Sequence, residues 1–351
     1  MLKKIMKKVN QNSRCKLSIE ELKKIYNTEY NSYSDITLVF RIFSSRNIAR
    51  DLIDLYGRDK VALNTDELDE STICYVGDLI VDRMLPTHNL KYVYGNIEYE
   101  LNEICNFENL EVISKNANLK KVNSSEGLDS LRIVGKTLNL GKVESVEYLE
   151  ELIYVGGDLP LDYVEDAKGL EKLQYIGNHA YFSRLKTSKS LKSLKFIGFC
   201  AYFQNLIDSY GLENLEYIGK SAYFSNLKNA EGLKNLKTIG NAEFDKLEDS
   251  KGLEKLEDIK DNAYFYSLKS FKGLISLSFI GGDATFSVLE DVNGLNNSLY
   301  ISYDANFPRL KNTESLEKIV YIGGKQNFGG MSLSELIDRS KSLCLKKKWK
   351  N

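Results

Sequence analysis

The stretch LENLEYIGKSAYFSNLKNAEG, residues 212–232, is followed at once by a near copy, LKNLKTIGNAEFDKLEDSKG, residues 233–252. The leucine that opens each copy recurs along the chain, at Leu128, Leu149, Leu170, Leu191, Leu212, Leu233, Leu253, Leu274, Leu295 and Leu316. These leucines are 21 residues apart except for one step of 20 residues, from Leu233 to Leu253. A fixed period of this length indicates a repeat architecture, in which each unit buries its apolar face against its neighbours.

The repeated unit is G-L-x-x-L-x-x-I-G-x-x-A-x-F-x-x-L-x-x-x-x, with at least eleven copies between about residues 107 and 328 and degenerate copies at 75–81 and 90–99. The A-x-F step is a two-residue alternation, so Ala and Phe point to the same side of a short strand. The I-G step before it turns the chain, because glycine tolerates unusual backbone angles. We therefore expect one short strand per coil, and a parallel sheet formed by the strands of successive coils.

The unit resembles a leucine-rich repeat, and the segments GLEKLQYIG (169–177) and YVGGDLPL (154–161) are similar to the repeats of receptor L domains. The resemblance implies a leucine-rich-repeat-like solenoid of β-helix-like, 21-residue coils. It covers about 70% of the chain and departs in one place. Where such repeats carry an Asn or Cys ladder after the strand, this chain carries leucine, at Leu185, Leu206, Leu227, Leu247 and Leu268.

The two ends of the chain break the repeat and have the pattern of helices. The Ser18–Glu21 capping box and the apolar spacing of residues 34–57 predict a helical N-terminal cap or docking region over residues 1–70. Residues 71–328 form the predicted solenoid. A second capping box, Ser332–Glu335, predicts that residues 329–351 form a C-terminal helix and a basic tail. Covering the exposed core of the end coils is the expected role of both helical segments.

Composition restricts the classes of function. The net charge of −1 offers no global attraction for nucleic acid or an anionic membrane. The five cysteines form no C-x-x-C pair, which fits a reducing compartment, and no apolar run is long enough to span a membrane. We therefore expect a cytoplasmic protein without metal or cofactor.

Motifs for catalysis are missing from the sequence. It has no phosphate-binding loop, no dinucleotide fingerprint, no H-E-x-x-H and no G-x-S-x-G. Two histidines, His88 and His179, provide little for a catalytic triad. We predict that the chain is not an enzyme and has no catalytic residue.

Aromatic columns are the most distinctive surface feature that the repeat predicts. The residue between Ala and Phe points away from the core, and the outward positions of this strand carry the candidate partner-binding residues Tyr181, Tyr202, Tyr223, Glu243, Asp245, Tyr264 and Tyr266. A second column precedes the Ile of each unit and includes Tyr175, Phe196, Tyr217, Phe279, Tyr300 and Tyr321. Both columns lose their aromatic residue in the 20-residue coil. These tyrosines are either a packing ladder between neighbouring strands or anchors for a partner, and the two interpretations are compatible.

Charges of alternating sign follow the leucines of neighbouring coils. Lys192, Glu213, Lys234 and Glu254 form one such series, and Lys195, Glu216, Lys237 and Glu257 form another. Opposite charges on adjacent coils predict ion pairs that fix the register of the stack.

These observations favour a non-enzymatic solenoid that binds a protein partner through its sheet face. Occlusion or scaffolding of the partner is the expected mode of action, and an inhibitor carried by a phage or a bacterium is one such hypothesis. Glycan binding by the tyrosines is the alternative. Nucleic-acid binding is disfavoured because the tyrosines are flanked by Glu243 and Asp245 rather than by a basic groove. The sequence leaves the oligomeric state open.

Overall fold

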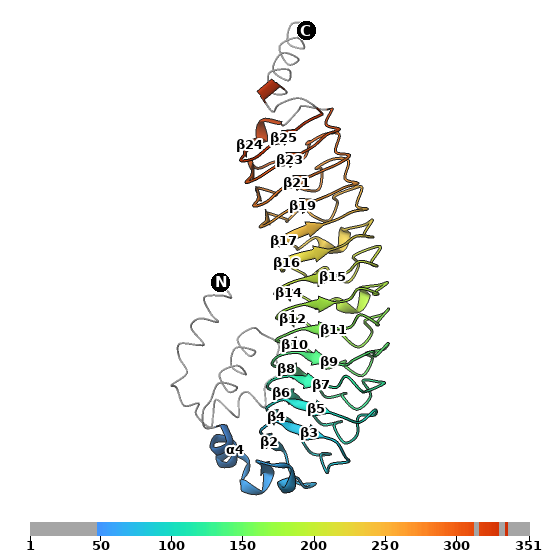
Figure 1. Cartoon of the computed structure of the whole chain (residues 1–351), viewed down its shortest axis with the longest axis vertical. Coiled ribbons are helices and arrows are strands. Elements are labelled where there is room, and N and C mark those ends of the chain that lie inside the picture. The colour runs from blue at the N-terminus through green and yellow to red at the C-terminus, as the bar shows by residue number, and fades with distance from the viewer. Residues whose placement is uncertain (1–47, 312–315, 330–333, 336–351) are drawn as a thin grey trace. The chain divides into compact units, whose positions relative to one another are not determined.

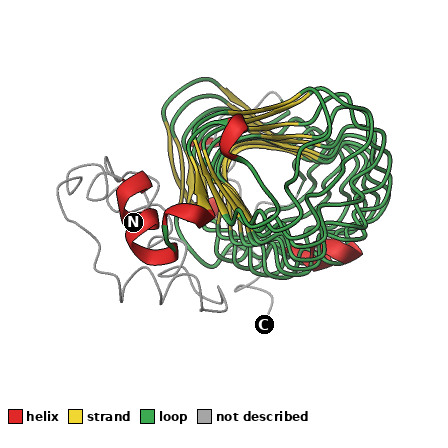
Figure 2. Ribbon diagram, turned by 90° about the horizontal axis from the view of Figure 1, so that it is seen from below, coloured by secondary structure: helices red, strands yellow, loops and turns green. Residues whose placement is uncertain are grey.

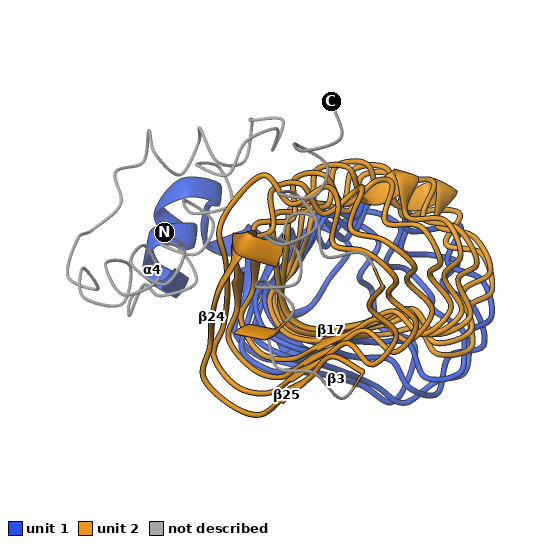
Figure 3. Ribbon diagram, turned by 90° about the horizontal axis from the view of Figure 1, so that it is seen from above, with its two compact units in different colours: residues 1–158 blue, residues 159–351 orange. Residues whose placement is uncertain are grey.

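The computed structural model describes residues 48–311, 316–329, 334 and 335. The chain divides into two compact units, Met1–Asp158 and Leu159–Asn351, which are coloured separately in Figure 3. Both units consist of parallel β-coils of about 21 residues, so the predicted β-solenoid is confirmed.

Unit 1 contains two parallel sheets, each built from one strand per coil. The first sheet consists of β1 (Val61–Ala62), β2 (Cys74–Val76), β4 (Tyr92–Tyr94), β6 (Val112–Ile113), β8 (Ile133–Val134) and β10 (Tyr154–Val155). The second consists of β3 (Leu79–Val81), β5 (Ile97–Tyr99), β7 (Ala117–Asn118) and β9 (Leu138–Asn139). Parallel pairing thus includes the two degenerate copies that the sequence indicated.

Unit 2 repeats this arrangement, and its coils stack in chain order (Figure 1). The first sheet contains β12 (Tyr175–Ile176), β14 (Phe196–Ile197), β16 (Tyr217–Tyr223), β17 (Thr238–Glu243), β18 (Asp258–Ile259), β20 (Phe279–Ile280), β22 (Leu299–Ile301) and β24 (Ile319–Ile322). The second contains β11 (Leu159–Pro160), β13 (Ala180–Tyr181), β15 (Ala201–Tyr202), β19 (Ala263–Tyr264), β21 (Ala284–Thr285), β23 (Ala305–Asn306) and β25 (Gln326–Asn327). Strands β16 and β17 pass through the corner between the two sheets and belong to both.

The expectation of one strand per coil is therefore wrong. Seen along the stack, strands occupy two adjoining sides of each coil and loops close the remainder (Figure 2). The aromatic-Ile pair that precedes the glycine turn is itself a strand, because its backbone groups pair with the equivalent residues of the next coil, as Tyr175 pairs with Phe196.

Helices are short in the described residues. Residues 48–311 contain one α-helix, α4 (Ile48–Tyr56), and four 3₁₀ turns, η1 (Arg58–Lys60), η2 (Thr65–Glu67), η3 (Lys189–Leu191) and η4 (Glu231–Leu233); η5 (Leu316–Lys318) follows. The α4 helix lies within the predicted helical stretch 34–57, whereas the Ser18–Glu21 capping box is outside the described residues. Of the predicted C-terminal helix, Ser334 and Glu335 are described, and both are helical. The helical caps therefore remain a prediction.

The core is a set of columns in which each position of the repeat stacks on itself. One of them is a phenylalanine ladder in unit 2, formed by Phe182, Phe203, Phe224, Phe244, Phe265, Phe286, Phe307 and Phe328, all fully buried. Neighbouring rings in this ladder lie nearly parallel, with centroids 5.0–5.4 Å apart. Leu185, Leu206 and the other leucines at the position of the usual Asn ladder are also fully buried, which confirms the apolar turn.

A polar ladder that the sequence did not reveal stands at the corner before the second sheet. Asn262 Oδ1 accepts the backbone N–H of Asp283 at 2.7 Å, Asp283 Oδ1 accepts that of Asp304 at 3.0 Å, and Asp304 Oδ1 accepts that of Lys325 at 2.7 Å. In unit 1, Asp78 Oδ1 accepts the N–H of Asn96 at 2.8 Å in the same way. Each side chain thus satisfies a backbone donor of the following coil, which the corner geometry leaves without a strand partner.

Candidate functional site

The predicted tyrosines lie on the outer face of the second sheet of unit 2. We call Tyr181, Tyr202, Tyr223, Tyr264 and Tyr266 the tyrosine stripe. Tyr181, Tyr202 and Tyr223 are in register on β13, β15 and β16. Their rings stack face to face, with centroids 4.8 Å apart for the first pair and 4.9 Å for the second, and interplanar angles of 5° and 14°. This part of the stripe is therefore both a packing ladder and a displayed surface.

Glu243 and Asp245, the acidic break, interrupt the stripe where the sequence predicted. Glu243 lies between Tyr223 and Tyr264 in the register of the sheet. Beyond it, Tyr264 and Tyr266 lie together with ring centroids 6.0 Å apart. All seven predicted residues thus occupy one face. Tyr266 is the most exposed residue of the tyrosine stripe, with 44% of its surface accessible to solvent.

The shortened coil explains the shape of the break. Only Gly240 and Asn241 separate Ile239 from Ala242 in β17. Strand β17 passes through the corner as β16 does, and the two strands pair across a register irregularity between Ile218 and Ser221. Asn241 Nδ2 donates a hydrogen bond to Glu243 Oε1 at 2.9 Å. The lost residue therefore changes the corner without moving Glu243 out of the tyrosine column.

Electrostatics distinguish the acidic break from the rest of the stripe. Burial raises the pKa of Glu243, and the negative charge of Asp245 raises it further. Burial is the main cause that raises the pKa values of Tyr264 and Tyr266. Asp283 and, to a smaller extent, Glu243 raise the pKa of Tyr264 further, and Asp245 and Glu243 raise that of Tyr266. In the stacked part, burial and the neighbouring Cys200 raise the pKa of Tyr202 to about 12. The break is thus a small, negatively charged patch between neutral tyrosines.

The second aromatic column lies on the first sheet and is interrupted at Thr238 and Asp258. Before the interruption, the rings of Phe196 and Tyr217 stack with centroids 4.9 Å apart. Beyond it, Phe279, Tyr300 and Tyr321 are in register and are 39%, 49% and 53% exposed. The sequence placed these residues in a column but did not indicate that its C-terminal part is more open than the stripe.

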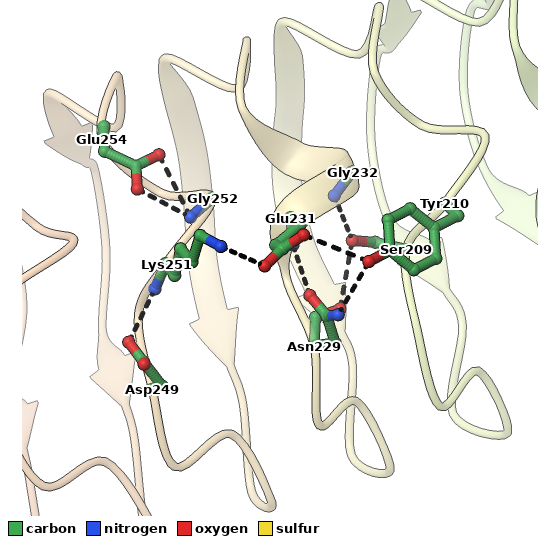
Figure 4. A network of polar contacts seen from close by, with 9 residues as sticks. All are labelled: Ser209, Tyr210, Asn229, Glu231, Gly232, Asp249, Lys251, Gly252 and Glu254. Carbon is green, nitrogen blue, oxygen red and sulfur yellow. Dashed lines mark hydrogen bonds and ion pairs between the residues drawn. The ribbon is translucent and has the colours of Figure 1, made fainter.

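The alternating charges act in two different ways. Lys237 Nζ and Glu216 Oε2 form the predicted pair between adjacent coils at 3.0 Å. Glu213 and Glu254 instead accept the backbone N–H of a glycine in their own coil, Gly211 or Gly252, at 2.9 Å (Figure 4 shows Glu254). For these two glutamates the predicted ion pairs are wrong, because each carboxylate instead binds the backbone N–H of a glycine two residues before it, whose φ is positive.

A polar network on the loop side of the coils joins three residues of successive coils (Figure 4). Tyr210 Oη donates to Glu231 Oε2 at 3.1 Å, and Lys251 Nζ lies 2.6 Å from Glu231 Oε1. Beneath it, the buried Ser209 hydroxyl accepts the N–H of Gly232 and donates to the carbonyl of Asn229. The partners of Glu231 lie within the chain itself, so we interpret this network as structural.

Within the described part of the chain, no group of three or more His, Cys, Asp or Glu side chains is arranged to hold a metal ion. The described helices also include none with the length and apolar character needed to cross a membrane.

Comparison with known proteins gives no family for this chain. No protein-family model matches it, and no curated protein is significantly similar to it. The interpretation of the site therefore depends on its geometry.

Proposed function

We propose that this chain is a non-enzymatic protein-binding solenoid that engages a protein partner through the tyrosine stripe. The observation that carries the proposal is the register of Tyr181, Tyr202 and Tyr223, whose rings are stacked and partly exposed on one sheet face. Tyrosine is favoured at protein interfaces because its ring buries apolar area while its hydroxyl forms hydrogen bonds.

The tyrosine rings of the stripe are already ordered by stacking, which also favours a binding function. Rings that already stack on their neighbours lose little side-chain freedom when a partner covers them, so more of the contact energy appears as affinity. A solenoid also presents its surface on a continuous sheet rather than on a mobile loop. Such a surface suits occlusion or scaffolding of the partner, including the role of an inhibitor encoded by a bacterium or phage.

Affinity capture from a cell lysate tests the proposal. The wild-type chain is compared with a triple variant, Tyr202→Ala, Tyr223→Ala and Tyr264→Ala, and with a matched control, Phe279→Ala, Tyr300→Ala and Tyr321→Ala. The control also removes three aromatic rings, but from the first sheet. We expect the stripe variant to lose specific partners that the control retains, with both variants folded by circular dichroism. Retention of the same partners by a folded stripe variant would contradict the proposal.

Glycan binding is a second candidate, and the exposure of Tyr300 (49%) and Tyr321 (53%) favours it. Sugars stack on the faces of aromatic rings, whereas Tyr181, Tyr202 and Tyr223 cover one another's faces. A glycan ligand would therefore depend on the C-terminal aromatics more than on the stacked tyrosines. Screening the same three proteins on a glycan array distinguishes the candidates, because the matched control above would then be the variant that loses binding.

A further inference from the structure

The chain shows in one place what can occupy a gap in an aromatic column. On the first sheet, Thr238 and Asp258 interrupt the column after Tyr217. Lys260 extends back across this gap and places Nζ 5.0 Å from the centroid of the Tyr217 ring and 3.5 Å from its hydroxyl oxygen. A lysine ammonium this close to a ring centroid is in cation–π range. The first gap therefore contains a cation from the chain itself.

In the part of the chain that the structure describes, the acidic break on the second sheet has no such cation. Among the described residues, neither Glu243 nor Asp245 has a lysine or arginine partner. Glu243 accepts a hydrogen bond from the neutral Asn241 side chain. The nearby Lys246 ammonium is directed to the side-chain oxygen of Asn226, at 2.6 Å. Two carboxylates thus lie two residues apart on one strand face, and no lysine or arginine of the described residues is paired with either.

The ring of Tyr223 borders this break. Tyr223 stacks on Tyr202 through one face of its ring. In the next coil its register partner is Glu243 rather than a tyrosine, so the ring stacking does not continue across the break. A cation in this position would contact the electron-rich face of Tyr223 and the carboxylates of Glu243 and Asp245 together.

We propose that the acidic break receives a lysine or arginine side chain of the protein partner, in the way that Lys260 occupies the gap beside Tyr217. This inference depends on the proposed function, since it assigns the chemistry of a partner that binds the tyrosine stripe. Charge complementarity selects a basic side chain, and the flanking tyrosines supply the apolar contact for its aliphatic stem.

The probe for this inference is a fluorescein-labelled, capped peptide of alternating lysine and serine, with a citrulline-serine peptide as its uncharged counterpart. Binding to the full chain is followed by fluorescence anisotropy. The test variant is Glu243→Gln with Asp245→Asn. The matched control is Glu257→Gln with Glu317→Gln, which removes two exposed carboxylates away from the stripe and changes the net charge equally.

We expect the lysine peptide to bind the wild-type chain and the control alike, and the test variant at least tenfold more weakly. Equal weakening in both variants, or binding of the citrulline peptide as strong as that of the lysine peptide, would overturn the inference. Absence of any lysine-peptide binding would overturn it as well.

The result is separable from that of the affinity capture. If the stripe variant keeps its partners while the lysine peptide still requires Glu243 and Asp245, the proposed docking face is wrong and the cation site stands. If the stripe variant loses its partners while the peptide shows no such requirement, the docking face stands and the cation site is wrong.

Discussion

The phenylalanine ladder and the tyrosine stripe belong to the same coils of unit 2 and differ in continuity. The ladder continues without interruption through the 20-residue coil, where Phe244 stacks on Phe224 and Phe265. The stripe stops in that coil, because Glu243 occupies the outward position next to Phe244. The two columns are formed by adjacent residues of one strand, so the inner column keeps its ring in this coil while the outer column does not.

This difference shows which features the fold requires. Interior volume must be filled in every coil, because a missing ring would leave a cavity beside its two neighbours. An outward residue contacts solvent and can change without opening a cavity. The sequence at the break is therefore open to selection for binding, whereas Phe244 is constrained by packing.

The largest effect is expected from breaking the inner ladder with Phe244→Ala. Truncating a buried phenylalanine costs about 3–5 kcal/mol of unfolding free energy, because both neighbouring rings lose a contact surface. Urea denaturation followed by circular dichroism measures the loss. Phe244→Leu is the control, since Leu119, Leu140 and Leu161 fill the equivalent position in the coils before Phe182, and it should cost clearly less. Equal losses would contradict this expectation and would show that the stacked ring, rather than the volume that it fills, supplies the stability.

A smaller loss is expected from breaking the outer ladder with Tyr202→Ala. The substitution removes two ring contacts, with Tyr181 and Tyr223, each worth about 0.5–1.5 kcal/mol. We expect a loss of about 1–2 kcal/mol in the same denaturation experiment. A loss as large as that of Phe244→Ala would place the stripe among the structural columns and weaken its assignment as an interface.

Completing the outer ladder with Glu243→Tyr should increase stability. The new ring is in register with Tyr223 and Tyr264, and it also removes a charge whose pKa is raised by burial. We expect a gain of about 1 kcal/mol, the scale of one aromatic pair, together with loss of lysine-peptide binding. An unchanged or lower melting temperature would show that the shortened corner cannot accept a ring at this position.

The smallest effect is a pH dependence due to Glu243. Because its pKa is raised above the usual 4.5 in the folded chain, the folded state keeps this proton to a higher pH than the unfolded state. The stability contributed by the protonated carboxyl is complete below the unfolded pKa and is lost as pH rises through the folded pKa.

Glu243→Gln lacks this loss. We expect the variant to be more stable than wild type by a few tenths of a kcal/mol, the scale of exposed charge interactions, above the folded pKa, with the difference shrinking toward pH 4. Thermal denaturation at several pH values measures it, with Glu257→Gln as the control. A difference that grows as pH falls would have the wrong sign.

Much of the fold could be predicted because the same apolar positions recur in every copy of the repeat, so each buried position is indicated many times. The period, the buried Ala, Ile, Leu and Phe columns and the position of the break were all readable from the sequence. The tyrosine stripe followed from strand alternation alone. Its function did not follow, because a tyrosine that packs on its neighbour and a tyrosine that binds a partner have the same sequence pattern.

Other features were hidden for physical reasons. Many strands of the first sheet have only two residues, as Phe196–Ile197 does, and are too short to show an alternation. The Glu254 carboxylate could bind either a backbone N–H of its own coil or a lysine of a neighbouring coil. The sequence does not show which of these donors lies within hydrogen-bond distance. The corner ladder uses Asn and Asp, residues typical of turns, so its continuity from coil to coil was not apparent.

That corner ladder also gives the stack a direction. Every link described runs from an acceptor on one coil to a backbone donor on the next, as in Asn262 to Asp283 and Asp283 to Asp304. Among the described residues, Lys325 is the donor in the last link, and its own side chain is an ammonium, which cannot accept a hydrogen bond. Within the described residues, each ladder coil before Lys325 thus provides an oxygen acceptor, whereas the Lys325 side chain provides none, so the two ends of the ladder are chemically different.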